Sequence, residues 1–156
     1  MKVESVFRPL ADMERALSDL YGTLSETFAA DTELAFVFFK MSAEEKGHAS
    51  LIEYQRRMVQ KNQGLSAEVE CDLTAIQETL ERARALSDSA GTLSPDDAIR
   101  ETLALETSAA EAHYRNALKQ SNPEIARLLG SLGGEDRLHT ERMRDLAMKR
   151  GIEVWK

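Results

Sequence analysis

Hydrophobic residues recur at steps of three and four along most of the chain, which is the spacing of one face of an α-helix. No stretch shows the sustained apolar and polar alternation of a half-buried strand. The pattern therefore predicts an all-α fold, with helices at about residues 4–29, 31–61, 66–88, 95–120 and 123–150. In the second of these segments the apolar positions include Leu34, Phe38, Leu51, Ile52 and Met58.

Residues that favour helix ends lie at the predicted boundaries. Asp31 and Ser94 are suitable N-caps, and Pro95 and Pro123 occupy first helical positions, where the missing N–H has no cost. Gly151 follows the last apolar position and is expected to end the final helix.

The connection between the second and the fourth predicted helix spans residues 62–93. A loop of a few residues would make two helices antiparallel neighbours, whereas a long connection lets the chain cross to the other end of a bundle. We therefore expect one domain over residues 1–156, built as a four-helix bundle with an extra helix at 66–88 in its crossover.

The charge balance and the cysteine content exclude several classes of function. The chain has 27 acidic and 20 basic residues, a formal charge of −7, which argues against nucleic-acid and anionic-membrane partners. The lone cysteine, Cys71, cannot form a disulfide or a four-thiolate site within one chain. No signal peptide or run of about 20 apolar residues is evident, so the expected location is the cytoplasm.

One short motif occurs twice in the predicted helices. Glu45 and His48 lie three residues apart in the second helix, and Asp136 and His139 lie three residues apart in the last. Residues at this spacing share a helix face. The flanking residues also correspond, which indicates an internal duplication of a helical hairpin.

A glutamate precedes each motif by about 30 residues and lies in an otherwise apolar stripe. These are Glu14 and Glu106, and each is followed seven residues later by a second corresponding pair, Tyr21 and His113. Buried carboxylates are costly unless a counter-charge neutralises them, and the apolar stripes here contain no lysine or arginine. Two divalent cations would supply that charge, and carboxylate together with imidazole suits iron, manganese or zinc.

On these motifs the chain resembles the ferritin-like superfamily, and within it the rubrerythrin-like branch. The resemblance implies two iron ions, with manganese or zinc as alternatives. It implies that one metal is held by Glu14 and His48, the other by Glu106 and His139, and that Glu45 and Asp136 bridge them. It further implies a homodimer that reduces peroxide or dioxygen while ferrous iron is oxidised.

The sequence departs from the family pattern in three respects. Asp136 stands where the family usually has glutamate, so its reach is one methylene shorter. The extra helix in the crossover makes a 24-subunit cage unexpected. The chain also lacks the four cysteines of a rubredoxin domain, so we expect an external electron donor, such as a rubredoxin-like protein or a small reductant.

The residues beside the motifs have less specific interpretations. Tyr21 is expected in the core with its hydroxyl bonded to a ligand carboxylate, and His113 either does the same or binds metal. Glu44 and Glu135 are rotated by about 100° from the motif acids and are assigned to the surface. Two other functions stay open: a non-catalytic protein that binds or stores metal, and a metal-free helical interaction module.

Overall fold

The computed structural model describes residues 1–62, 68, 73–119 and 123–153, except for the side chains of 111–119, 125 and 129. Apart from an isolated bridge between Lys2 and Glu68, the regular secondary structure of this part is helical. The helices are α1 (Glu4–Thr27), α2 (Thr32–Lys61), α3 (Leu73–Asp88), the short 3-10 helix η2 (Ala90–Thr92), α4 (Pro95–Lys119) and α5 (Pro123–Lys149). The predicted all-α fold is confirmed.

The helix ends follow from the residues predicted to form them. The Asp31 side chain accepts a hydrogen bond from the Leu34 N–H at 3.2 Å, and the Ser94 hydroxyl accepts one from the Asp97 N–H at 3.1 Å. Gly151 has a φ of 67°, a left-handed conformation that favours glycine and ends α5. The predicted start of the crossover helix, near residue 66, lies outside the described residues.

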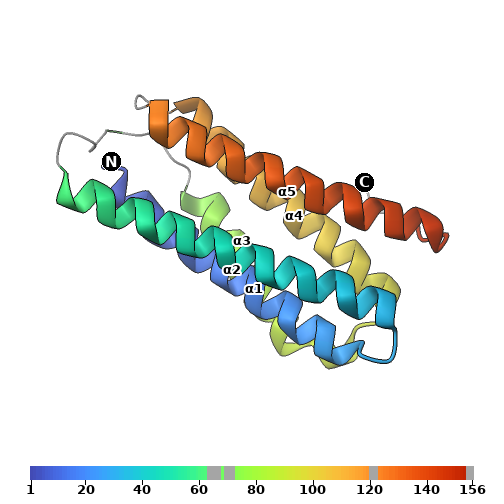
Figure 1. Ribbon diagram of the computed structural model, residues 1–156. Coiled ribbons are helices and arrows are strands. Elements are labelled where there is room, and N and C mark those ends of the chain that lie inside the picture. The colour runs from blue at the N-terminus through green and yellow to red at the C-terminus, as the bar shows by residue number, and fades with distance from the viewer. Residues whose placement is uncertain (63–67, 69–72, 120–122, 154–156) are drawn as a thin grey trace.

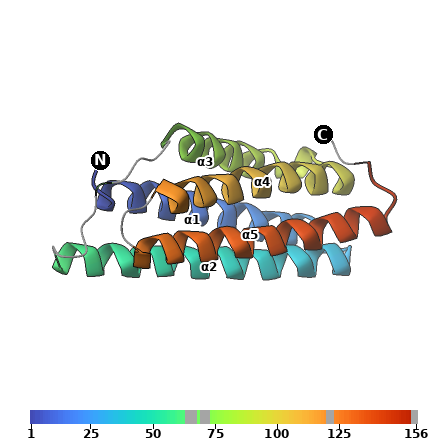
Figure 2. The same ribbon diagram turned by 90° about the horizontal axis from the view of Figure 1, so that it is seen from above.

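Two helical hairpins form the bundle, and α3 covers one side of it. Helices α1 and α2 run antiparallel and pack closely, as do α4 and α5 (Figure 1). Helix α3 packs against α1 and α4, as the view from above shows (Figure 2), and Arg82 of α3 donates a hydrogen bond to Glu101 of α4 at 2.6 Å. This is the predicted bundle with a helix in its crossover.

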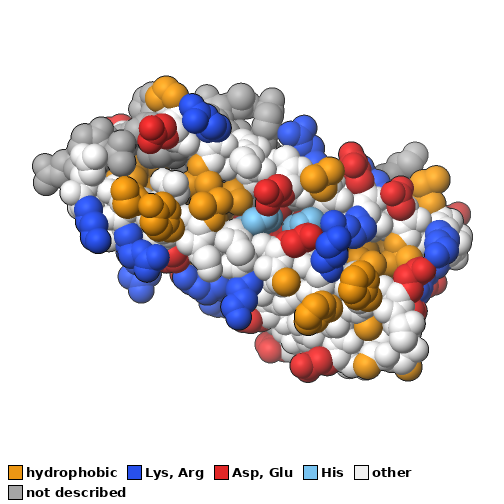
Figure 3. Space-filling view, viewed as in Figure 1, with side chains coloured by type: hydrophobic (Ala, Val, Ile, Leu, Met, Phe, Trp, Pro, Cys, Tyr) orange, Lys and Arg blue, Asp and Glu red, His pale blue; other side chains and the backbone are white. Residues whose placement is uncertain are grey.

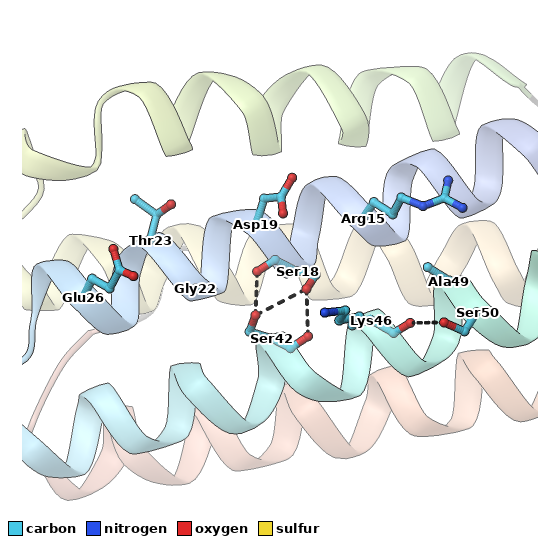
Figure 4. A pocket seen from close by; sticks show the side chains of 10 residues that line it. All are labelled: Arg15, Ser18, Asp19, Gly22, Thr23, Glu26, Ser42, Lys46, Ala49 and Ser50. Atoms are coloured by element: carbon cyan, nitrogen blue, oxygen red, sulfur yellow. Dashed lines mark hydrogen bonds between the residues drawn. The ribbon is translucent and has the colours of Figure 1, made fainter.

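A reciprocal pair of serines brings α1 and α2 close together. The Ser18 hydroxyl donates to the Ser42 carbonyl and the Ser42 hydroxyl donates to the Ser18 carbonyl, each at 2.8 Å (Figure 4). A side chain at Gly22 would approach the Ser42 hydroxyl to 3.4 Å, so a small residue suits this contact. Ser18 lies one turn after Glu14, and Ser42 lies just under one turn before Glu45. The serine pair therefore fixes the positions of Glu14 and Glu45 relative to each other along the paired helices α1 and α2.

The core contains the predicted apolar stripes, with one difference in α2. Leu34, Phe38 and Ile52 are fully buried, whereas Leu51 and Met58 are 41% and 38% exposed. Their placement in the buried stripe was therefore wrong, because α2 has apolar residues on two faces. None of the helices in the described part of the chain is long and apolar enough to span a bilayer.

Candidate metal centre

Six predicted ligand residues meet in the middle of the bundle, and each of its four long helices contributes at least one. All six side chains are buried, and the four carboxylates are inaccessible to solvent. The residues are Glu14 from α1, Glu45 and His48 from α2, Glu106 from α4, and Asp136 and His139 from α5.

The six residues form two overlapping groups. In each group every residue offers one donor atom, and these atoms lie within 4.8 Å of one another. The first group is Glu14, Glu45, His48 and Asp136, and the second is Glu45, Glu106, Asp136 and His139. Glu45 and Asp136 belong to both, so the shorter Asp136 side chain reaches both groups. The arrangement has the form of two metal positions joined by two shared carboxylates.

Both histidines direct the same ring nitrogen, Nδ1, toward the carboxylates. His48 Nδ1 lies 3.1 Å from Glu45 Oε2 and 3.8 Å from Glu14 Oε2. His139 Nδ1 lies 2.9 Å from Glu45 Oε1 and 3.6 Å from Glu106 Oε2. The two rings stack with their centroids 5.8 Å apart and their planes inclined by 11°. The duplicated motifs thus give two geometrically equivalent half-sites.

The outer nitrogen, Nε2, of each histidine contacts a glutamate from the opposite hairpin. Glu135 of α5 contacts His48, and Glu44 of α2 contacts His139. Both glutamates are partly exposed, and Glu44 also accepts a hydrogen bond from Arg142 at 3.3 Å. The surface assignment of these two residues missed their contact with the site. The sequence signal for this contact was the glutamate that directly precedes each motif acid, Glu45 in α2 and Asp136 in α5.

Three of the buried groups have pKa values far from their ordinary range. Burial and the charge of Glu45 raise the pKa of Glu106 to about 8. Burial opposes protonation of His48, but the carboxylates of Glu14 and Glu45 outweigh it and raise its pKa to about 12. Glu106 and Glu45 likewise raise the pKa of His139 to about 10 against the effect of burial. Without metal, protons therefore supply the positive charge that the carboxylates need.

Tyr21 lies beside the second group, as predicted. Its hydroxyl donates a hydrogen bond to Glu106 Oε1, and its ring stacks on Phe38 with centroids 6.1 Å apart. Burial and the neighbouring Glu106 raise the pKa of Tyr21 well above 10, so the hydroxyl stays protonated and acts as a donor. His113 lies in α4, but its side chain is outside the described residues, so its predicted role stays a prediction.

The donor set fits divalent transition metals. Each group offers three carboxylates and one imidazole, a mixture that suits iron, manganese or zinc. Glu106 Oε2 is buried and has no hydrogen-bond partner among the described residues. A buried oxygen of this kind is costly in a protein interior unless a cation or donor satisfies it.

Comparison with known families agrees with this geometry. The model of the Rubrerythrin family matches residues 11–147. This chain therefore belongs to the rubrerythrin family. The matched region contains all six ligand candidates, and rubrerythrins are ferritin-like proteins that typically bind two irons. Neither a search of curated proteins nor a search of solved structures returned a match to this rubrerythrin-family chain.

Proposed function

We propose that this rubrerythrin-family protein is a dinuclear-iron oxidoreductase that reduces hydrogen peroxide or dioxygen. The observation that carries the proposal is the pair of overlapping donor groups sharing Glu45 and Asp136. Shared carboxylates hold two metals close together, which permits a reaction that takes one electron from each. A site for a single structural ion would need only one of the groups.

The charge of the ligands favours iron that changes its oxidation state. The four buried carboxylates carry a combined charge of −4 when ionised, which balances two ferrous ions. Anionic oxygen ligands stabilise the ferric state more strongly than the ferrous state, because the higher cation charge increases the attraction. The ligand set therefore supports oxidation of the bound metal.

The reaction needs two electrons and two protons for each peroxide. Two ferrous ions held by the six residues would supply the two electrons, which together with two protons would convert hydrogen peroxide into two molecules of water. Glu45 and Asp136, which belong to both groups, would hold both metals, while Glu44 and Glu135 contact the imidazoles from outside and orient them. Tyr21 donates a hydrogen bond to Glu106 and fixes that carboxylate.

An external reductant would return the protein to its ferrous form. The described residues provide no cysteine cluster for electron transfer, and the whole chain has one cysteine. We therefore propose a separate electron donor, such as a rubredoxin-like protein, or a small reductant.

Anaerobic titration with ferrous iron, followed by peroxide, tests the proposal. Binding should saturate near two irons per chain, and peroxide should oxidise the bound iron faster than free ferrous iron. The Glu45→Ala variant should show neither property, because it lacks a carboxylate common to both groups. Saturation at two irons without faster oxidation would instead identify a non-catalytic metal-binding protein, and the absence of saturable binding would exclude both functions.

A further inference from the structure

The two halves of the metal centre differ in what holds their outer glutamates. Glu44, which contacts His139, also accepts a hydrogen bond from Arg142 at 3.3 Å. Glu135, which contacts His48, is 52% exposed, whereas Glu44 is 30% exposed. In the part of the chain that the structure describes, no lysine or arginine forms an ion pair with Glu135. Glu44 is therefore held by two partners, and Glu135 is held by its histidine alone.

The internal duplication shows which residues cause this difference. Glu45 corresponds to Asp136 in the repeated motif, and six residues after each of them lie Leu51 and Arg142. Leu51 is 41% exposed and stands where the other half of the centre has the arginine. A leucine side chain can neither donate a hydrogen bond to Glu135 nor neutralise its charge. The two half-sites are thus equivalent at the buried ligands and different at the surface.

The histidines are the part of the metal centre nearest to solvent. The four ligand carboxylates are fully buried, whereas His48 and His139 are 5% and 3% exposed. Figure 3 shows histidine rings at the surface between α2 and α5, with acidic side chains beside them and basic side chains gathered on one side. The described residues therefore bring the centre to the surface along the line where α2 and α5 meet.

The interior of the bundle above and below the centre is apolar. Leu10 and Ile52 lie four residues from ligand residues toward one end of the bundle, and Met41 and Met143 lie four residues from ligand residues toward the other. All four side chains are fully buried. A hydrated divalent cation gives up its water for oxygen or nitrogen ligands, and these side chains offer neither. A cation therefore has no favourable path along the bundle axis.

Polar groups form a continuous series past His48. Glu135 contacts the outer nitrogen of this ring, and Glu45 and Glu14 lie 3.1 Å and 3.8 Å from its inner nitrogen, Nδ1. Asp136 lies 4.0 Å from the same nitrogen and belongs to both groups of ligands. A cation that passes His48 thus meets oxygen ligands at each step and reaches both metal positions.

We propose that metal ions enter and leave the centre past His48, at the side where Glu135 lies. The negative charge of Glu135 attracts a cation to this side, and its exposed side chain can turn from the histidine into solvent. Arg142 has the opposite effect on the other side, because its guanidinium neutralises Glu44 and holds it in place. Arg142 is therefore a positioning residue that acts through Glu44. The proposal rests on the two-metal centre of the proposed function.

Stopped-flow uptake of Co²⁺ by the metal-free protein tests this route, because the visible absorption of Co²⁺ changes when carboxylate and imidazole replace water. Glu135→Gln should slow uptake by at least about 10-fold, since it removes the charge that attracts the ion. Glu44→Gln is the matched control, because it makes the same change at the equivalent residue of the other half. At physiological ionic strength it should change the rate by less than about twofold, since ions do not pass that side.

Exchange of the two corresponding residues gives a second test. Leu51→Arg should slow uptake by about 10-fold, because it places a cation beside Glu135. Met58→Arg adds the same charge to α2 two turns further along and should leave the rate unchanged. Arg142→Leu should raise the rate about twofold by opening an equivalent route on the other side. Addition of Leu51→Arg to this variant should restore the wild-type rate, which a purely structural role of Arg142 does not predict.

The outcomes separate this proposal from the proposed function. Equal slowing by Glu135→Gln and Glu44→Gln, or equal rates for Leu51→Arg and Met58→Arg, would overturn the entry route while leaving the two-metal centre in place. Absence of saturable Co²⁺ binding in the wild-type protein would overturn the proposed function and the route with it. Circular dichroism verifies that each variant is folded, and all the substituted side chains are at least partly exposed.

Discussion

Glu135 of α5 contacts the Nε2 atom of His48 on α2, although Glu135 precedes Asp136 directly in the sequence and is 52% exposed. Glu44 makes the equivalent contact with His139 in the opposite direction. A hydrogen bond from Nε2–H to this carboxylate keeps one imidazole proton on Nε2, so Nδ1 can offer its lone pair to a metal once that metal displaces the Nδ1 proton. Each hairpin thus orients the histidine of the other.

Loss of this contact should weaken metal binding without unfolding the protein. We expect Glu135→Ala to reduce metal affinity by about 10–100-fold, the usual effect of removing a group that orients a ligand histidine. Competition with a chelator of known affinity measures the change. Glu141→Ala provides the control, because Glu141 is exposed on the same helix. An equal affinity of both variants would show that the Glu135 contact has no role in binding.

The two overlapping groups predict how many metals each variant binds. Glu14 belongs to the first group alone, so Glu14→Ala should retain one metal per chain. Glu45→Ala removes a carboxylate common to both groups and should retain none. Metal analysis after dialysis distinguishes these outcomes, and circular dichroism verifies that both variants are folded. Identical metal content in the two variants would contradict the shared role of Glu45.

Metal binding should release protons and should strengthen as the pH rises. In the metal-free protein His48, His139 and Glu106 hold protons, because their pKa values are raised to about 12, about 10 and about 8. A metal needs the neutral imidazoles and the ionised carboxylate, so it displaces these protons. Calorimetry in buffers of different ionisation enthalpy counts the protons released. An affinity that is constant between pH 6 and pH 8 would contradict the prediction.

The hydrogen bond from Tyr21 to Glu106 should stabilise the fold. Tyr21→Phe leaves a buried carboxylate oxygen without its donor and should lower the free energy of unfolding by about 1–3 kcal/mol. Urea denaturation of the metal-free protein measures the loss. Tyr54→Phe removes a hydroxyl that is exposed to solvent and should change stability little. A similar loss of unfolding free energy in both variants would show that the effect comes from replacing any tyrosine with phenylalanine, and not from the buried hydrogen bond.

Helix periodicity and motif spacing were sufficient to predict the bundle and its six central residues. The steps of three and four in α1 to α5 depend on local geometry, which a sequence displays directly. Repetition of the motif in α2 and α5, with Glu14 and Glu106 ahead of it, indicated that the acids share a depth in the bundle. The boundaries also followed from local residues, as at Asp31 and Gly151.

Contacts between helices depended on the tertiary structure. Glu44 and Glu135 lie off the motif face of their own helices, so only the position of the opposite hairpin brings them to the histidines. Leu51 and Met58 look like core residues in sequence, because apolar positions on two faces of α2 merge into one pattern. Sequence spacing thus determined which residues share a helix face, whereas the packing of the hairpins decided what each face contacts.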